Sequence, residues 1–98
     1  MAELIWTEPA LQDLQELAEY ISIENPQAAQ KLIQSVFSMV ETLIDFPYSG
    51  RKPPELPETE YREKVVQPVR IFYRVENDLV YIVHIMRSER DLRNFLLK

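Results

Sequence analysis

The sequence contains no cysteine, and only one histidine and one glycine, among its 98 residues. Without cysteine there is no disulfide framework, no thiolate nucleophile and no thiolate-bound metal. One histidine cannot build a histidine metal centre alone. No apolar run approaches the ~18 residues that cross a bilayer, and the first ten residues carry two glutamates and no basic residue, unlike a signal peptide. These absences predict a cytoplasmic protein without a metal or cofactor.

Basic side chains are scarce in the first part of the chain. Residues 1–60 hold three basic and eleven acidic side chains, whereas residues 61–98 hold eight basic and five acidic ones. A protein that binds the phosphates of RNA normally shows a strong basic excess. The net charge of −5 therefore argues against a protein that binds nucleic acid through its phosphates.

The apolar pattern of the first half predicts a strand and two helices. Leu4–Trp6 is a short strand, and Thr7 is a candidate N-cap with Pro9 in the first helical turn. Asn25 followed by proline repeats this start signal, and the second helix runs to about Asp45. The apolar positions at helical spacing are Leu11, Leu14, Leu17, Ala18 and Ile21, then Ala29, Leu32, Ile33, Val36, Val40, Leu43 and Ile44.

The second half predicts three strands, Tyr61–Val66, Val69–Val75 and Leu79–Met86, with turns at residues 67–68 and 77–78. The whole chain, residues 1–98, is then one α+β domain of order β-α-α-β-β-β, with a helical hairpin packed on one face of an antiparallel sheet. The other face is left partly uncovered, and we expect the function there.

A tight turn at Asn77 and Asp78 predicts which strand residues share a face. One face is the more uniformly apolar and should receive the helices; it pairs Val75 with Val80, Tyr73 with Ile82 and Ile71 with His84. The other face pairs Arg74 with Tyr81, Phe72 with Val83 and Arg70 with Ile85. An apolar strip bordered by arginines suits an amphipathic, acidic partner segment. The alternative is that the C-terminal tail folds back over this strip.

Six segments in order make the chain similar to the RelE/ParE toxin superfamily, with FP-x-x-GR followed by RE more typical of its ParE branch. They are Trp6-Thr7-Glu8-Pro9-Ala10, Tyr20-Ile21, Asn25-Pro26-Gln27-Ala28-Ala29, Phe46-Pro47-Tyr48-Ser49-Gly50-Arg51, Tyr61-Arg62-Glu63, and Arg70-Ile71-Phe72-Tyr73-Arg74 together with residues 84–90. The resemblance implies a type II toxin that inhibits DNA gyrase and is neutralised by a ParD-like antitoxin. A toxin with an exposed arginine-bordered strip should be stored bound, so we expect the antitoxin on this strip, namely on Arg70, Phe72, Arg74, Tyr81 and Val83.

The RelE branch of the superfamily contains ribosome-dependent mRNA endonucleases. By resemblance, Arg70 matches a phosphate-contacting arginine of that branch, and Arg62 and Lys64 can stand for two strand lysines. A second arginine position reads Ser88, and the catalytic tyrosine falls near Asn94. Two groups that would stabilise and protonate the cleaved phosphodiester are thus missing, and we expect no catalytic residues. An mRNA endonuclease and a non-toxic, antitoxin-binding remnant remain the alternatives.

The C-terminal segment after residue 86 carries three arginines, Arg87, Arg90 and Arg93, with Leu92, Phe95 and Leu96 at helical spacing. These arginines either contact the toxin's target or form exposed ion pairs worth about 0–1 kcal/mol each. Glu63 is expected to pair across the sheet with Arg70 or Arg74. His84 is expected on the helix-covered face as a core or rim residue.

Overall fold

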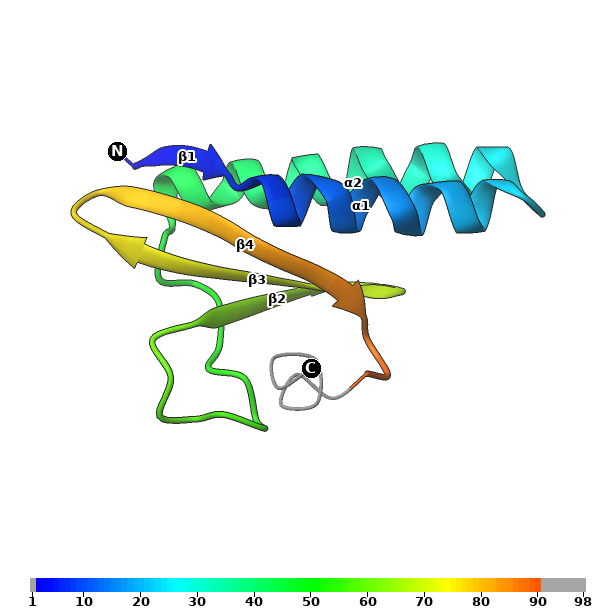
Figure 1. Ribbon diagram of the computed structural model, residues 1–98. Coiled ribbons are helices and arrows are strands. Elements are labelled where there is room, and N and C mark those ends of the chain that lie inside the picture. Colours follow the sequence, from blue (N-terminus) through cyan, green and yellow to red (C-terminus); the bar gives the residue numbers. More distant parts are fainter. Residues whose placement is uncertain (1, 91–98) are drawn as a thin grey trace.

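Two helices lie over one face of a four-stranded sheet in the computed structural model, which describes residues 2–90 (Figure 1). The α+β class and the element order agree with the sequence prediction. In chain order the elements are β1 (Glu3–Trp6), α1 (Glu8–Ser22), α2 (Pro26–Asp45), β2 (Arg62–Val66), β3 (Val69–Glu76) and β4 (Leu79–Arg87). Leu92, Phe95 and Leu96, whose helical spacing suggests one more short helix, fall outside the described residues.

Both helices begin at the predicted caps. The Thr7 hydroxyl oxygen accepts a hydrogen bond from the backbone N–H of Ala10 at 3.3 Å, and the Asn25 side-chain oxygen accepts one from Ala28 at 3.0 Å. Each cap satisfies an N–H that the first helical turn leaves without a partner. The joint between the two helices is short, so they run antiparallel as a hairpin.

The sheet order is β1-β4-β3-β2, and β1 joins β4 in parallel while the other pairs are antiparallel. The sheet is therefore mixed, whereas a purely antiparallel one was expected. The hairpin explains the difference, because α2 returns the chain to the start of β1, where the N–H of Ala2 donates to the carbonyl of Ile44. β2 then runs in the direction of β1, and two further turns bring β4 into the same direction.

The β3–β4 turn has the predicted tight geometry, with positive φ angles at Asn77 and Asp78. Pairing follows the expected register as far as Tyr73 with Ile82, and then a bulge at Val83 shifts it by one residue. Beyond the bulge the observed pairs are Phe72 with His84, Ile71 with Ile85 and Arg70 with Met86. The expected pairs Ile71–His84, Phe72–Val83 and Arg70–Ile85 are therefore wrong.

The bulge lies beside the point where β1 ends and α1 begins. Thr7 at this point and Asp13 in α1 form hydrogen bonds with the edge of β4. The Thr7 hydroxyl donates to the carbonyl of Ile82 at 2.7 Å, and an Asp13 carboxylate oxygen accepts the N–H of Ile85 at 3.0 Å. The same Asp13 oxygen lies 3.3 Å from Nδ1 of His84. The shift places Ile85 in the helix-facing core and His84 opposite Phe72, the reverse of the expected arrangement.

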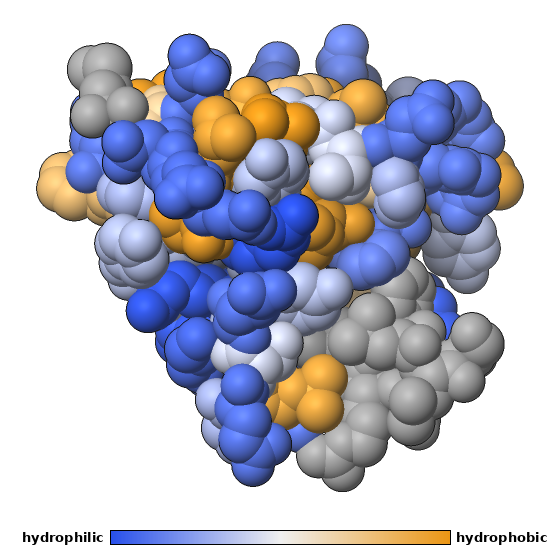
Figure 2. All heavy atoms as spheres, turned by 60° about the vertical axis from the view of Figure 1, so that its left-hand side comes forward, coloured by the Kyte–Doolittle hydropathy of each residue, from blue (hydrophilic) through white to orange (hydrophobic). Residues whose placement is uncertain are grey.

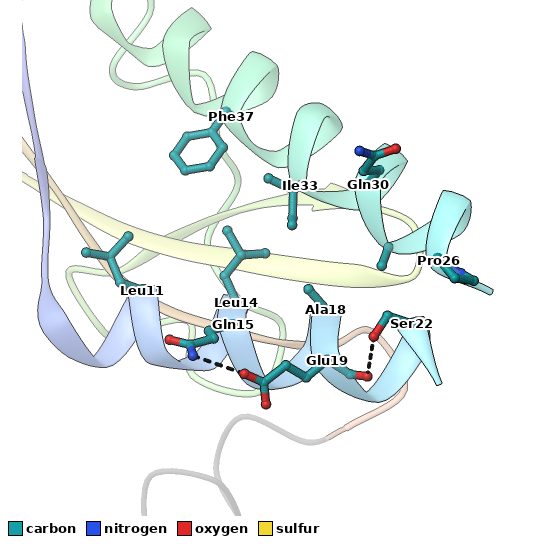
Figure 3. A pocket seen from close by; sticks show the side chains of 11 residues that line it. Leu11, Leu14, Gln15, Ala18, Glu19, Ser22, Pro26, Gln30, Ile33 and Phe37 are labelled. Atoms are coloured by element: carbon teal, nitrogen blue, oxygen red, sulfur yellow. Dashed lines mark hydrogen bonds between the residues drawn. The ribbon is translucent and has the colours of Figure 1, made fainter. Parts of the chain in front are cut away.

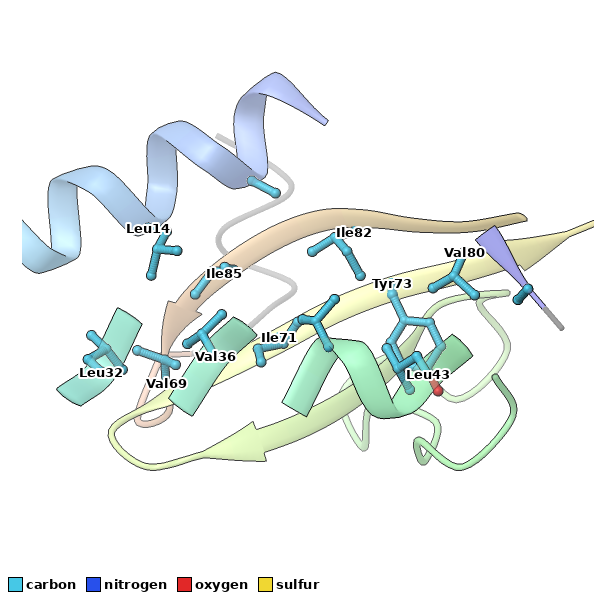
Figure 4. Packing of buried hydrophobic residues seen from close by; sticks show 13 residues of the cluster. Leu14, Leu32, Val36, Leu43, Val69, Ile71, Tyr73, Val80, Ile82 and Ile85 are labelled. Atoms are coloured by element: carbon cyan, nitrogen blue, oxygen red, sulfur yellow. The ribbon is translucent and has the colours of Figure 1, made fainter. Parts of the chain in front are cut away.

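The main core lies between the helices and the sheet (Figure 4). Leu14, Val36 and Leu43 point from the helices toward Ile71 and Ile82 of the strands, and all five are buried. Every one of these positions was expected in the core from its spacing. Burial of apolar area here, at roughly 25 cal/mol per Å², is the main stabilising contribution of the fold.

Tyr73 closes the core beside the only glycine. Its ring is fully buried, and its hydroxyl oxygen accepts the backbone N–H of Gly50 at 2.8 Å. Burial raises the pKa of the Tyr73 hydroxyl above its ordinary value of 10.0. A Cβ added at Gly50 would lie 2.5 Å from this hydroxyl oxygen and 2.8 Å from the backbone oxygen of Glu63. Glycine is required here because the Tyr73 side chain and the Glu63 backbone approach it too closely to leave room for a side chain. Its φ angle is not positive, so the backbone conformation alone does not require glycine.

We expect Gly50→Ala to lower the free energy of unfolding by about 1–3 kcal/mol, because the new methyl group overpacks a site bounded by backbone. Chemical denaturation of the purified variant measures this. Gln34→Ala, at an exposed position of α2, serves as the control and should change stability by less than about 0.5 kcal/mol. An unchanged midpoint for Gly50→Ala would show that the site relaxes freely.

Candidate interaction surfaces

The face of the sheet opposite the helices is covered around Phe72 and Met86 and is partly exposed at Arg74 and Tyr81, so it is more closed than the sequence predicts. The segment of residues 52–61, here called the covering loop, passes beneath the sheet (Figure 1). Its Leu56 packs against a second apolar cluster, in which Phe72 and Met86 are buried and Val83 is partly buried. The expected exposure of Phe72 is wrong, because its exposed fraction is 0%.

Arg70 binds the covering loop to the sheet. Its guanidinium donates to both carboxylate oxygens of Glu55 at 2.6 Å and to one oxygen of Glu63 at 2.6 and 3.1 Å. It also donates to the backbone oxygen of Arg90 at 2.8 Å. The hydrogen bond with Glu55 raises the pKa of Arg70 above its ordinary value, and this outweighs the opposing effect of burial. The side chain of Glu63 is fully buried, and Arg51 donates to its second oxygen at 2.7 Å.

Arg70 is therefore an internal ion-pair residue and does not border an open strip. Its exposed fraction is 5%, which corrects the predicted surface position. The prediction that Glu63 pairs with Arg70 is confirmed. A buried arginine with two carboxylate partners has its donors occupied and its charge compensated, so it is unavailable to a phosphate.

The remaining residues of the predicted strip lie at its border. The Arg74 guanidinium stacks 4.3 Å above the Tyr81 ring and pairs with Glu76. Both Arg74 and Tyr81 are partly exposed, and Val83 packs on the second cluster. The structure thus brings Phe72 and Val83 into a small core, and it leaves Arg74 and Tyr81 accessible to a partner.

Of the three arginines predicted to contact the target, the structure describes two, Arg87 and Arg90. The side chain of Arg87 is half exposed, pairs with Glu89 at 2.7 Å and lies 6.0 Å from the Tyr20 ring. Arg90 is exposed, and its backbone oxygen accepts from Arg70. Arg93 lies outside the described residues, as do Leu92, Phe95 and Leu96. A role of these arginines in target contact stays a prediction.

Sequence reasoning missed an open groove of about 420 Å³ between the two helices (Figure 3). This hairpin groove has six apolar residues along its length and polar side chains at its rims. It is lined by Leu11, Leu14, Ala18, Ala29, Ile33 and Phe37, with Gln15, Glu19, Ser22, Pro26 and Gln30. The sequence does contain a sign of this groove. Ala18 and Ala29 are small residues on the facing sides of the helices, and they leave space between them.

The groove leaves apolar side chains in contact with solvent. Leu11 and Phe37 remain 43% and 39% exposed; Leu11 belongs to the predicted apolar pattern of its helix, whereas Phe37 lies outside that pattern. Figure 2 shows apolar atoms gathered over the upper layer, where β1 and the helices lie, while polar residues dominate below. Between residues 8 and 45 the chain carries seven acidic side chains and one basic one. The hairpin groove is thus an apolar channel with Glu19 in its lining, on two helices that carry mostly acidic side chains.

Within residues 2–90, no three histidine or acidic side chains come together as a metal site. In that same part of the chain, no helix is both long and apolar enough to cross a membrane.

Residues 4–92 match the family described as the ParE toxin of the type II toxin–antitoxin system parDE. Toxin RelE2 of Caulobacter vibrioides is 35% identical over 91 residues, which cover 92% of this chain and 99% of that protein.

Two solved structures share the fold. The chromosomal ParDE system of P. aeruginosa matches with a TM-score of 0.73 and 29% identity, over 91% of this chain and 98% of that one. The toxin–antitoxin complex RelBE2 of Mycobacterium tuberculosis matches with a TM-score of 0.59 and 17% identity, over 89% and 98%.

We expect Arg70→Met to lower the free energy of unfolding by about 3–5 kcal/mol, since it leaves the buried carboxylate of Glu63 with one cation fewer. Arg74→Met is the matched control, because it removes an arginine whose partner Glu76 is exposed; it should cost less than about 1 kcal/mol. Thermal denaturation of both variants decides this. Equal, small losses would mean that the Arg70 ion pairs do not hold the covering loop.

Proposed function

Because the chain belongs to the ParE toxin family of type II toxin–antitoxin systems, we propose that it inhibits DNA gyrase in the cytoplasm without catalysing a reaction. We propose further that a ParD-like antitoxin holds it inactive. The observation that carries the non-enzymatic proposal is the state of Arg70. This residue stands where the RNA-cleaving branch has a phosphate-contacting arginine, and here it is buried between Glu55 and Glu63.

Other residues support the same proposal. Arg62 donates to the backbone oxygens of Tyr48 and Gly50, so its guanidinium is engaged within the fold. Ser88 and Asn94 stand where an arginine and a catalytic tyrosine would stabilise and protonate a cleaved phosphodiester. The net charge of −5 also disfavours a ribosomal RNA surface. The alternative of an mRNA endonuclease therefore has few groups left to perform the reaction.

The hairpin groove is the surface best suited to the antitoxin. Two matched structures are described as toxin–antitoxin systems, so a protein partner is expected for this chain too. An amphipathic helix laid between α1 and α2 would bury the exposed edges of Leu11 and Phe37. Glu19 in the lining, on helices whose charged side chains are mostly acidic, favours an antitoxin helix with basic residues beside its apolar face. Contacts of the antitoxin with Arg74, Tyr81 and Val83 stay a prediction for a second part of the interface.

Purified protein should inhibit DNA supercoiling by gyrase and should leave mRNA intact in a translating extract, because the cleavage groups are absent or engaged. The two assays are run side by side with the same preparation, and relaxed plasmid and total mRNA are the readouts. Codon-specific cuts without gyrase inhibition would contradict the proposal. Antitoxin binding without either activity, and without growth arrest on induction, would identify a non-toxic remnant.

Leu11→Glu should weaken antitoxin binding at least about tenfold, because it places a charge against the apolar face of the bound helix. Ser38→Glu makes a comparable acidic change at an exposed position of α2 outside the hairpin groove and should leave the affinity unchanged. Isothermal titration with the purified antitoxin measures both. If both variants bind like the wild type, the antitoxin uses another surface.

A further inference from the structure

The segment Phe46–Arg51, here called the aromatic turn, connects α2 to the covering loop and presents two rings to solvent. Phe46 is 65% exposed and Tyr48 is 64% exposed. Neither ring therefore contributes much to the core, and exposed aromatic side chains grouped on one segment are typical of interaction sites.

The backbone of the aromatic turn is fixed in place by the sheet. The N–H of Gly50 donates to the buried Tyr73 hydroxyl, and Arg62 donates to the carbonyl of Gly50 at 2.8 Å. Arg51 and Glu63 exchange two backbone hydrogen bonds, at 2.8 and 3.1 Å. Two exposed rings on a backbone held by this many bonds lose little conformational freedom on binding, so their burial is converted efficiently into affinity.

One cation lies against a ring of the aromatic turn, and two more follow in the sequence. The guanidinium of Arg62 lies 5.2 Å from the centre of the Tyr48 ring, and the side chain of Arg51 is 63% exposed. Residues 1–60 contain only three basic side chains, and two of them, Arg51 and Lys52, are adjacent at this point. Asp45, directly before Phe46, is the nearest exposed carboxylate along the chain. The turn thus combines two exposed rings with three basic side chains, of which Arg51 pairs with the buried Glu63 and Lys52 donates to the carbonyl of Thr59.

We infer that the aromatic turn is a contact surface for the toxin's target and that it docks onto an acidic protein surface. Tyrosine and arginine are the residues most enriched among those that dominate binding energy, and the flanking cations complement a negative partner. A protein partner is favoured over a nucleic acid because the chain as a whole lacks the basic excess that phosphate binding requires. The assignment rests on the proposed toxin function.

This surface is separate from the proposed antitoxin site. The hairpin groove is lined by residues between Leu11 and Phe37, and none of its lining belongs to the aromatic turn. Substitutions at the turn should therefore act on toxicity and leave antitoxin binding intact.

The test uses the full chain with Phe46→Ser and Tyr48→Ser combined. The concentration of toxin needed for growth arrest should rise at least about tenfold, while the melting temperature and the antitoxin affinity stay at wild-type values. Ile23→Ser combined with Val65→Ser is the matched control, because it removes two exposed apolar side chains elsewhere (79% and 39% exposed) and should leave growth arrest unchanged. Lys52→Glu should also weaken growth arrest, since it reverses a flanking charge.

Each other outcome is decisive. A wild-type chain that fails to arrest growth overturns both the proposed function and this assignment. A wild-type chain that arrests growth, with an equally toxic turn variant, overturns the assignment alone. Loss of antitoxin affinity in the turn variant with toxicity retained would make the turn an antitoxin contact. Binding of a single-stranded oligonucleotide by the wild type, lost in the turn variant, would replace the protein partner with a nucleic acid.

Discussion

The ion pairs of Arg70 with Glu55 and Glu63 are the interaction on which the rest of the structure depends. They hold the covering loop under the sheet and keep Phe72 and Met86 out of solvent. They also compensate the buried charge of Glu63, which would otherwise be costly. With Phe72 and Met86 covered, the hairpin groove is an open apolar surface between the helices, and the aromatic turn carries two exposed rings. Antitoxin and target can therefore bind different surfaces of one small domain.

Local signals in the sequence were sufficient for most of the fold. Thr7 and Asn25 cap the helices as predicted, because capping depends on residues three positions apart. The turn at Asn77 and Asp78 follows from the tolerance of these residues for positive φ angles. The apolar periodicity identified the core face of both helices, since only one face of each is repeatedly apolar.

Three features could not be predicted because they depend on tertiary partners. The bulge at Val83 requires Thr7 and Asp13 to bind the edge of β4, and those residues are more than seventy positions away in sequence. The covering loop has no helical or strand periodicity, so the packing of Leu56 on the cluster of Phe72 and Met86 leaves no pattern in the sequence. From the sequence alone, Arg70 is expected at the surface, because its burial depends on Glu55, which only the folded chain brings next to it. These misses explain why the strip from Arg70 to Val83 was mistaken for an open binding face.

The most direct test of this account is the solvent exchange of the Arg70 side chain, observed through its Nε–H group in a ¹H–¹⁵N spectrum of the toxin. The account predicts slow exchange for Arg70, faster exchange for the partly exposed Arg74, and no change in the Arg70 signal when an RNA oligonucleotide is added. Fast exchange of Arg70, or a shift of its signal on adding RNA, would contradict the closed sheet face and the non-enzymatic function proposed from it.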